Sequence, residues 1–464
     1  MDYLIILNLT SSQESFSDYY FLKLNNIPIW QFLYNRVINY FSDKEVIIIS
    51  DIEDIIIYAS RLGYKYKKVN KKYNLNSILS FRRLQKMIII SAAYPLIRLD
   101  EIQNVIKLQW PSNTIVIGVS EYLNNLHPFV ITNEIDITYN INKIYYKMSN
   151  NNICVNNLNN FWVVERLLQR KKIVFHVACY KEIGYGHLYR AIMLAMELKK
   201  HDIIFAISEK SYPFAVKMLT PHGFQIYKIN EENYINEILN ILPNMVINDI
   251  LNTDSNYISK LKMKGIKVIN FEDLGNGGIL SDITINELYE DPLYESKNTL
   301  WGHNYYFLRN EFLSAKKNNE IKIKNILLTF GGTDQNDYTR KILYLIYPYC
   351  RENDINIFVV IGPGYFNYKE LKKEMHYFDN NIVKLYHKPG IMSAIMEKVQ
   401  FAISSNGRTI YELAHMNIPA IVICHHERET NHTFSNEKNG FINLGIYKNG
   451  ETEKEILIWL KRFV

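Results

Sequence analysis

The chain has 464 residues, of which 48% are hydrophobic, and its formal net charge is +6. This length allows roughly two to four domains with large cores, and so small a net charge gives no case for nucleic-acid binding. The four cysteines form no CxxC pair, which fits a reducing compartment. No run approaches the roughly 18 uninterrupted apolar residues of a membrane span, and the N-terminus lacks a signal-peptide pattern. We therefore expect a soluble, cytoplasmic protein without a membrane span.

Short apolar runs alternate with helix-period segments along the chain, which is typical of α/β proteins with parallel sheets. In the first part, strands are predicted at 3–9, 45–49, 86–91 and 114–119, with helices at 29–40 and 52–61. An asparagine-rich stretch then predicts a linker over residues 148–171. Two further series follow, with strands at 172–178, 203–207, 245–247 and 268–271, and then at 326–330, 357–361, 401–404 and 420–424. We therefore expect three α/β domains, over residues 1–147, 172–312 and 313–464.

A glycine-rich corner joins the strand at 172–178 to a helix-type run at 191–198. Its sequence is Ile183-Gly184-Tyr185-Gly186-His187-Leu188-Tyr189-Arg190. Glycine turns of this kind let the backbone approach a ligand closely and direct free N–H groups at an anion. His187 would lie in the first turn of the helix, where the helix dipole favours the neutral imidazole that a base requires. The corner is a candidate catalytic site, although an ordinary βα turn with a surface histidine would have the same spacing.

Two later strands end in similar corners. They are Gly331-Gly332-Thr333 after the strand at 326–330, and Asn406-Gly407-Arg408-Thr409 after the strand at 401–404. Such turns can offer N–H and hydroxyl groups to phosphates, and Glu412, one helical turn further on, can accept both hydroxyls of a ribose. Because α/β proteins bind ligands at the carboxyl edge of the sheet, three such corners fit a nucleotide diphosphate.

A histidine-rich segment, residues 425–432, follows the strand at 420–424. A zinc-protease motif needs a second histidine four residues after the first, and Thr430 occupies that position after His426. We therefore expect no metal and no other cofactor. A polar loop in which His426 and Glu427 contact the nucleotide or sugar is favoured over a merely solvated loop, because the segment adjoins the corner at 406–412.

These motifs, in this order, resemble the UDP-sugar hydrolase of pseudaminic acid biosynthesis and its spore-coat polysaccharide relatives, which belong to the two-lobed GT-B superfamily. The resemblance covers residues 172–450, and the matching segments are 183–190, 271–274, 306–312, 328–334, 406–413, Pro419 and 427–429. Two positions depart from the hydrolases. Asn406-Gly407 stands where they carry a glycine pair, and His426 stands where they carry an asparagine.

The resemblance also implies roles for individual residues. His187 would be catalytic and help water displace UDP from the anomeric carbon of the sugar, with Asp249 as the family's acidic residue. The other residues of the first corner (Gly184, Tyr185, Gly186 and Arg190) and the two later corners with Glu412, His426 and Glu427 would bind the substrate.

Residues 1–145 more faintly resemble the cytidylyltransferases that make CMP-activated nonulosonic acids, through segments 22–30, 94–97 and 127–129. That family grips a triphosphate with a loop rich in Arg, Gly and Lys. The corresponding segment here, Asn8–Asp18, has no glycine and no basic residue, and its Glu14 and Asp18 would repel a polyanion. The resemblance therefore implies a degenerate, Rossmann-like domain of the nucleotidyltransferase type, with a structural role or a docking role toward a pathway enzyme.

The leading interpretation is a UDP-sugar hydrolase of surface-glycan or nonulosonic acid synthesis. A GT-B glycosyltransferase is the alternative, because water and an acceptor hydroxyl need the same base. A non-catalytic scaffold that binds nucleotide is a third interpretation, which the degenerate first domain favours.

Overall fold

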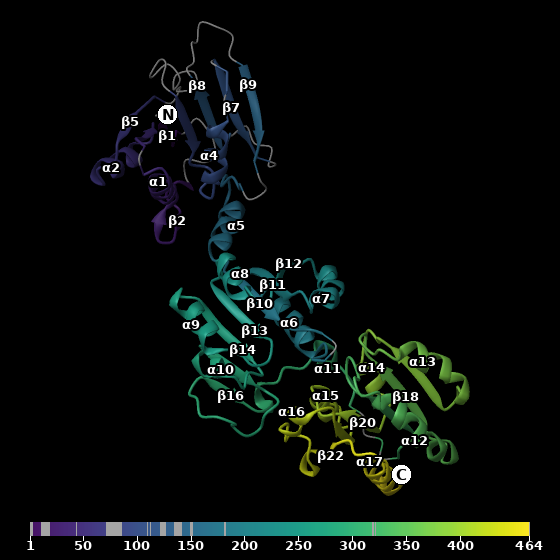
Figure 1. Ribbon diagram of the computed structural model, residues 1–464. Coiled ribbons are helices and arrows are strands. Elements are labelled where there is room, and N and C mark those ends of the chain that lie inside the picture. The colour runs from purple at the N-terminus through teal and green to yellow at the C-terminus, as the bar shows by residue number, and fades with distance from the viewer. Residues whose placement is uncertain are drawn as a thin grey trace. The chain divides into compact units, whose positions relative to one another are not determined.

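The computed structural model describes residues 3–10, 19–42, 44–70, 86–108, 110–111, 113–120, 127–133, 142–148, 152–180, 182–317, 320 and 322–463. These residues form two compact units, Met1–Arg170 and Lys171–Val464, both of the predicted α/β class (Figure 1). Within the described ranges, no helix has the length and apolar character needed to cross a membrane.

The first unit is built on a seven-stranded sheet of order β5-β4-β1-β6-β8-β7-β9. Its strands are β1 (Leu4–Asn8), β4 (Val46–Ser50), β5 (Tyr66–Lys68), β6 (Met87–Ser91), β7 (Thr114–Val119), β8 (Phe129–Asn133) and β9 (Asn142–Lys147); β2 (Lys23–Leu24) and β3 (Ile27–Pro28) form a separate hairpin. The four strands predicted here are all present. The sheet is nevertheless mixed rather than parallel, because the unpredicted β8 runs antiparallel to both β6 and β7.

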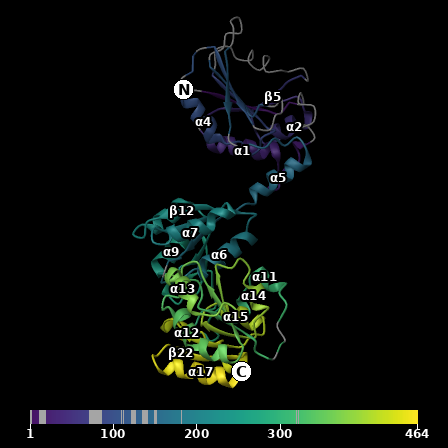
Figure 2. The ribbon, with the colours of Figure 1, turned by 90° about the vertical axis from the view of Figure 1, so that its right-hand side faces the viewer.

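Four helices pack on one face of this sheet (Figure 2). They are α1 (Ile29–Tyr40), α2 (Glu53–Arg61), α4 (Leu99–Lys107) and α5 (Leu158–Leu168). The last lies in the range expected to be a linker. Its Asn157 cap accepts a hydrogen bond from the main-chain N–H of Asn160 at 2.8 Å, so the asparagines that suggested a loop in fact begin a helix. Most of the expected triphosphate segment, residues 11–18 with Glu14 and Asp18, lies outside the described residues.

The second unit begins with a lobe whose seven-stranded sheet is parallel throughout, in the order β12-β11-β10-β13-β14-β15-β16. Its strands are β10 (Lys172–Val177), β11 (Asp202–Ser208), β12 (Gln225–Ile229), β13 (Met245–Asp249), β14 (Lys267–Phe271), β15 (Ile283–Asn286) and β16 (Thr299–Trp301). Helices α6 (Gly186–Glu197) and α7 (Tyr212–Leu219) cover one face, and α8 (Tyr234–Asn240) and α9 (Ser255–Met263) cover the other. The short α10 (Asn276–Leu280) follows β14.

The second lobe has a six-stranded parallel sheet of order β19-β18-β17-β20-β21-β22. Its strands are β17 (Asn325–Thr329), β18 (Asn356–Ile361), β19 (Val383–His387), β20 (Phe401–Ser405), β21 (Ala420–Cys424) and β22 (Phe441–Ile446). Helices α12 (Tyr338–Glu352), α13 (Tyr368–Glu374) and α17 (Glu451–Phe463) cover one face, and α11 (Asn310–Leu313), α14 (Ser393–Met396) and α15 (Thr409–His415) cover the other. The short α16 (Glu427–Thr430) follows β21. The unit therefore consists of two Rossmann-like lobes, as predicted.

The strand order of both lobes reverses beside the first strand. The chain runs from β10 to β11 and β12 on one side and then crosses to β13 on the other, and it does the same from β17 to β19 and then to β20. Ligands of open α/β sheets bind at such switch points, outside the carboxyl ends of the strands. The three glycine corners follow β10, β17 and β20, so all of them lie at these points.

Candidate active site

The first glycine corner leads from β10 into α6 at the carboxyl edge of the first lobe. Gly184 has a φ of +80°, a backbone conformation that favours glycine, and α6 begins two residues later at Gly186. His187 is therefore the second residue of the helix, and only 7% of it is exposed.

Arg190, one turn further along α6, is fully buried and is held by three carboxylates. They come from three neighbouring strands: Asp249 ends β13, Glu272 follows β14 and Glu287 follows β15. The Nε and Nη2 atoms of Arg190 donate to Asp249 at 2.8 and 2.6 Å. Its Nη1 donates to Glu272 at 2.5 Å and to Glu287 at 2.6 Å. Parallel strands end at one edge of the sheet, which is why these side chains can converge on a single guanidinium.

His187 and Asp249 form a buried pair, with 2.6 Å between Nδ1 and Oδ1. Burial alone would raise the pKa of Asp249, but the Arg190 guanidinium and His187 outweigh it and hold that pKa below its ordinary value. Nδ1 of His187 also lies 3.2 Å from Nη2 of Arg190, but its contact with the carboxylate is the shorter one; because a charged carboxylate can only accept hydrogen bonds, we assign the proton of the imidazole to Nδ1. In a neutral imidazole, Nε2 is then the basic nitrogen.

The second and third corners approach the first one closely. Gly331 has a φ of +77°, so the turn after β17 also needs glycine. A Cβ atom placed on Gly332 would lie 3.3 Å from the ring of Tyr185, and one on Gly186 would lie 3.4 Å from Cδ of Arg408. The two lobes therefore bring the three corners together, as the nucleotide-diphosphate hypothesis requires.

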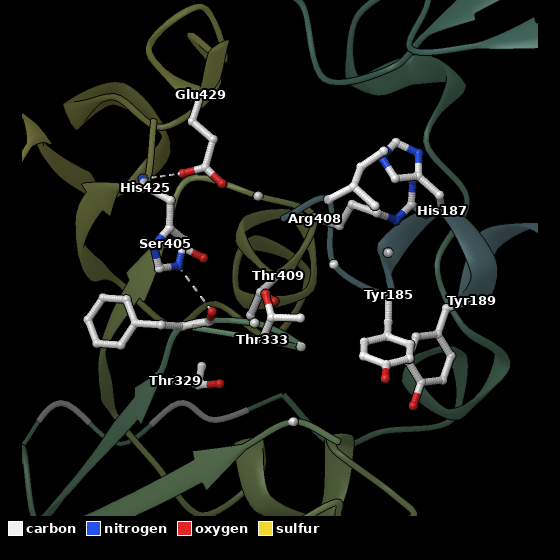
Figure 3. Close-up of a pocket in the computed structure, with 18 of the residues that line it drawn as sticks. Tyr185, His187, Tyr189, Thr329, Thr333, Ser405, Arg408, Thr409, His425 and Glu429 are labelled. Atoms are coloured by element: carbon white, nitrogen blue, oxygen red, sulfur yellow. Dashed lines mark hydrogen bonds between the residues drawn. The ribbon is translucent and has the colours of Figure 1, made fainter. Parts of the chain in front are cut away.

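A cavity of about 770 Å³ lies among these corners. The predicted site residues that line it are Gly184, Tyr185, Gly186, His187, Arg190, Gly331, Gly332, Thr333, Gly407, Arg408, Thr409, Glu412, His426 and Glu427. Figure 3 shows His187 and Arg408 next to each other, with Thr333 and Thr409 nearby.

Two of the predicted residues do not line the cavity. Asp249 is buried, with Oδ1 against His187. Asn406, expected to bind substrate, turns away from the cavity, and its Nδ2 donates to the main-chain carbonyls of Glu429 at 2.8 Å and His432 at 3.0 Å. An amide can serve two carbonyls at once, and here it fixes the loop after β21 against the third corner.

Two charged residues of the third corner are already paired. Arg408 forms an ion pair with Glu287 of the first lobe, and burial together with the nearby Arg190 lowers the pKa of Arg408 to about 10. Glu412 accepts a hydrogen bond from Nε of Arg309 at 2.9 Å, yet burial raises the pKa of Glu412 above its ordinary value. A phosphate or ribose at this corner would therefore compete with protein partners.

Sequence reasoning assigns no role to four charged residues of the site, namely Glu272, Glu287, Arg309 and Arg428. Glu272, Arg309 and Arg428 lie inside segments that carry the resemblance to the hydrolases, so the resemblance could have indicated that they belong to the site. Glu287 follows β15, a strand that the hydrophobic pattern did not reveal.

Two histidines of the histidine-rich segment contact main-chain carbonyl oxygens. Nε2 of His425 lies 3.2 Å from the carbonyl oxygen of Phe330, and Nδ1 of His432 lies 2.7 Å from that of Asn406. In the part of the chain that the structure describes, no three His, Cys, Asp or Glu side chains are placed to hold a metal ion.

Several known proteins are similar to this chain. The uncharacterized protein MJ1062 of Methanocaldococcus jannaschii is 32% identical over 267 residues, which cover 53% of this chain and 54% of that protein. The spore coat polysaccharide biosynthesis protein SpsG of Bacillus subtilis is 25% identical over 290 residues, covering 58% of this chain and 84% of its own length. The UDP-2,4-diacetamido-2,4,6-trideoxy-beta-L-altropyranose hydrolase of Campylobacter jejuni is 24% identical over 177 residues, covering 35% of this chain and 61% of its own length.

The chain thus spans about half the length of the archaeal relative. No family model matches it. Among solved structures, MurG of Acinetobacter baumannii aligns with a TM-score of 0.46 and 12% identity, over 62% of this chain and 91% of the MurG chain.

Proposed function

We propose that the unit Lys171–Val464 is a nucleotide-sugar hydrolase, which releases UDP and free sugar in the synthesis of a surface glycan or a nonulosonic acid. The observation that carries this proposal is the His187–Asp249 pair, whose histidine lines the same cavity as the turns at 331–333 and 407–409. Two relatives support the choice of ligand, since one is named for polysaccharide biosynthesis and the other for hydrolysis of a UDP-linked sugar.

In the proposed reaction, Nε2 of His187 takes a proton from a water molecule as the water oxygen attacks the anomeric carbon. The bond between that carbon and the β-phosphate oxygen breaks, and its electron pair leaves with UDP. Main-chain N–H groups of the 331–333 turn, with the hydroxyls of Thr333 and Thr409, bind the phosphates. A positioned base is worth about 10²–10⁴ in rate, and orientation and charge neutralisation supply the rest.

The proposal is tested by a panel of nucleotide sugars, scored by mass spectrometry for UDP and free sugar, with UDP binding measured by calorimetry. His187→Ala should lower turnover by about 10²-fold or more and leave UDP binding intact. His222→Ala is the matched control, because His222 is an exposed histidine of the same lobe that does not line the cavity. Wild-type turnover in His187→Ala would exclude the assignment of the base. UDP retention by the wild type without turnover of any nucleotide sugar would favour a scaffold.

A glycosyltransferase is the second candidate, because the rings of Tyr180, Tyr185 and Tyr189 line the same cavity and a sugar acceptor can stack on them. The same base would then take the proton of an acceptor hydroxyl. Free sugar that appears without any acceptor supports the hydrolase, whereas UDP release that depends on an acceptor supports the transferase.

For the first unit, the resemblance of residues 1–145 supports a degenerate cytidylyltransferase-like domain that docks an enzyme of the same pathway. It should neither bind CTP nor form a CMP-linked product from a nonulosonic acid. CTP turnover by the full chain would contradict this.

A further inference from the structure

Arg428 reaches from the second lobe to two loops of the first lobe. It lies on α16, directly after β21. Its Nη1 donates to Oδ1 of Asn252 at 2.9 Å, and its Nη2 donates to the main-chain carbonyl of Glu272. The guanidinium also lies over the ring of Tyr289, 5.8 Å from the ring centroid. One side chain of the second lobe thus holds the loops that follow β13 and β14.

Glu272 has an uncommon backbone conformation, which its contacts hold in place. Its φ is +51°, a left-handed conformation that is uncommon for a residue other than glycine and persists where the surroundings fix it. Here the N–H of Glu272 donates to the carbonyl of Ile285 at 3.0 Å, its carboxylate binds Arg190, and its carbonyl binds Arg428. The Glu272 carboxylate also lies 4.0 Å from Nη1 of Arg408, but among the described residues Arg428 is the one side chain of the second lobe that donates a hydrogen bond to the main chain of Glu272.

The Glu272 carboxylate is linked to the base through three successive contacts. It accepts from Nη1 of Arg190, and Nε and Nη2 of the same guanidinium hold both oxygens of Asp249. Asp249 in turn fixes the ring of His187. The side chains from Glu272 to His187 are buried, so a displacement at one end is transmitted through packed, charged contacts.

We propose that Arg428 is a positioning residue for the base, so that His187 is held in its working orientation only when the second lobe is closed over the first. This inference rests on the proposed function. It adds that Arg428 acts through Glu272 and Arg190 and restricts hydrolysis to the closed form. An open molecule would then hold a nucleotide on the second lobe without attacking it.

The test compares turnover with UDP affinity in the full chain. Arg428→Gln should lower kcat on the order of 10²-fold, as a misplaced reacting group does, and this fall should far exceed any change in the dissociation constant of UDP, although Arg428 lines the cavity. Arg428→Lys keeps one donor and should recover part of the lost kcat. Thr430→Ser is the matched control, since Thr430 is an exposed residue of the same short helix and serine keeps the hydroxyl that donates to the carbonyl of Glu427, so both quantities should be unchanged.

A double substitution shows whether Arg428 acts through Glu272. If it does, Arg428→Gln combined with Glu272→Gln should lose little more kcat than the stronger single variant, because both changes break one chain of contacts. Should Arg428→Gln fail to fold, Asn252→Ala removes one of the two acceptors and should give a smaller fall in kcat at unchanged UDP affinity.

Three results would overturn the inference: normal kcat in Arg428→Gln (or in Asn252→Ala, if that variant is used), weakened UDP binding with kcat unchanged, or fully additive losses in the double variant. A failure of the proposed function looks different, since the wild type itself would then release no UDP.

Discussion

Replacing Asp249 with asparagine tests the catalytic pair most directly, because the change keeps the shape of the side chain but removes its charge and one of its two acceptor oxygens. Asp249 accepts three hydrogen bonds, two from Arg190 and one from His187. Asparagine has one acceptor oxygen and one NH₂ donor. If its oxygen faces Nε of Arg190, the NH₂ group faces Nδ1 of His187. That nitrogen can accept only if its proton moves to Nε2, and the cavity then faces a donor instead of a base. The opposite orientation sets the NH₂ group against Nε of Arg190 and lets the oxygen accept from Nδ1 of His187 and Nη2 of Arg190; the tautomer is then kept, but the charge that stabilises a protonated His187 is lost.

The expected fall in kcat follows from the rate enhancement that a positioned base contributes. That enhancement is about 10²–10⁴, which corresponds to about 2.7–5.4 kcal/mol of transition-state stabilisation. UDP binding should change little, because Asp249 does not line the cavity. Asp249→Asn should therefore lower kcat by that factor and leave the dissociation constant of UDP near its wild-type value.

The assay is single-turnover release of UDP from the nucleotide sugar that the panel identifies, with UDP calorimetry on the same preparations. Thermal unfolding of each variant serves as the control for loss of the fold. Wild-type kcat in a folded Asp249→Asn protein would refute the reasoning, since the charged carboxylate beside His187 would then have no bearing on the reaction.

Further predictions concern stability and pH. A Cβ atom on Gly362 would lie 2.4 Å from the carbonyl oxygen of Gly332. Gly362→Ala should therefore lower the free energy of unfolding, measured by chemical denaturation, by about 1–3 kcal/mol and weaken UDP binding. Gly390→Ala is the control and should be neutral, because a Cβ atom there has no neighbour within 4 Å. Burial raises the pKa of Glu412, so UDP affinity should fall as the pH drops toward that pKa, and calorimetry of Glu412→Gln should show this dependence removed. Asp249 has a lowered pKa, so its stabilisation is complete above about pH 4 and is lost as the pH falls through the lowered value; Asp249→Asn should flatten this acid loss in denaturant titrations.

Most interior strands could be predicted from sequence, and the edge strands β5, β9, β12, β16, β19 and β22 could not. β20 and β21 are buried at every residue, because a central strand of a parallel sheet has both faces covered, and such strands read as continuous apolar runs. β12 and β19 lie at sheet edges and are largely exposed or half-buried, so they carry no such run. β8 was not predicted. The mixed character of the first sheet could not be predicted either, because strand direction leaves no mark on the residue pattern.

The candidate site could be predicted only where residues adjoin a motif along the chain. The corners at 184–190, 331–333 and 406–412 follow strands directly, and their spacing was visible. The partners of Arg190 were not, since Glu272 and Glu287 are 82 and 97 residues away and meet it only through the strand order. Asn406 differs in another way, because it was predicted to bind substrate from its place in a motif, whereas the structure shows its amide donating to two main-chain carbonyls.

The buried ionic cluster around Arg190 has an electrostatic consequence. Among the described residues, the three buried carboxylates there pair with two guanidinium groups, those of Arg190 and Arg408, which with a neutral His187 leaves one formal negative charge at the wall of the cavity. Cleavage of a glycosyl bond passes through a state in which the sugar ring carries positive character. A sugar ring beside His187 would sit in the field of that surplus anion, which lowers the energy of a cationic ring and repels any group that develops negative charge on the same side.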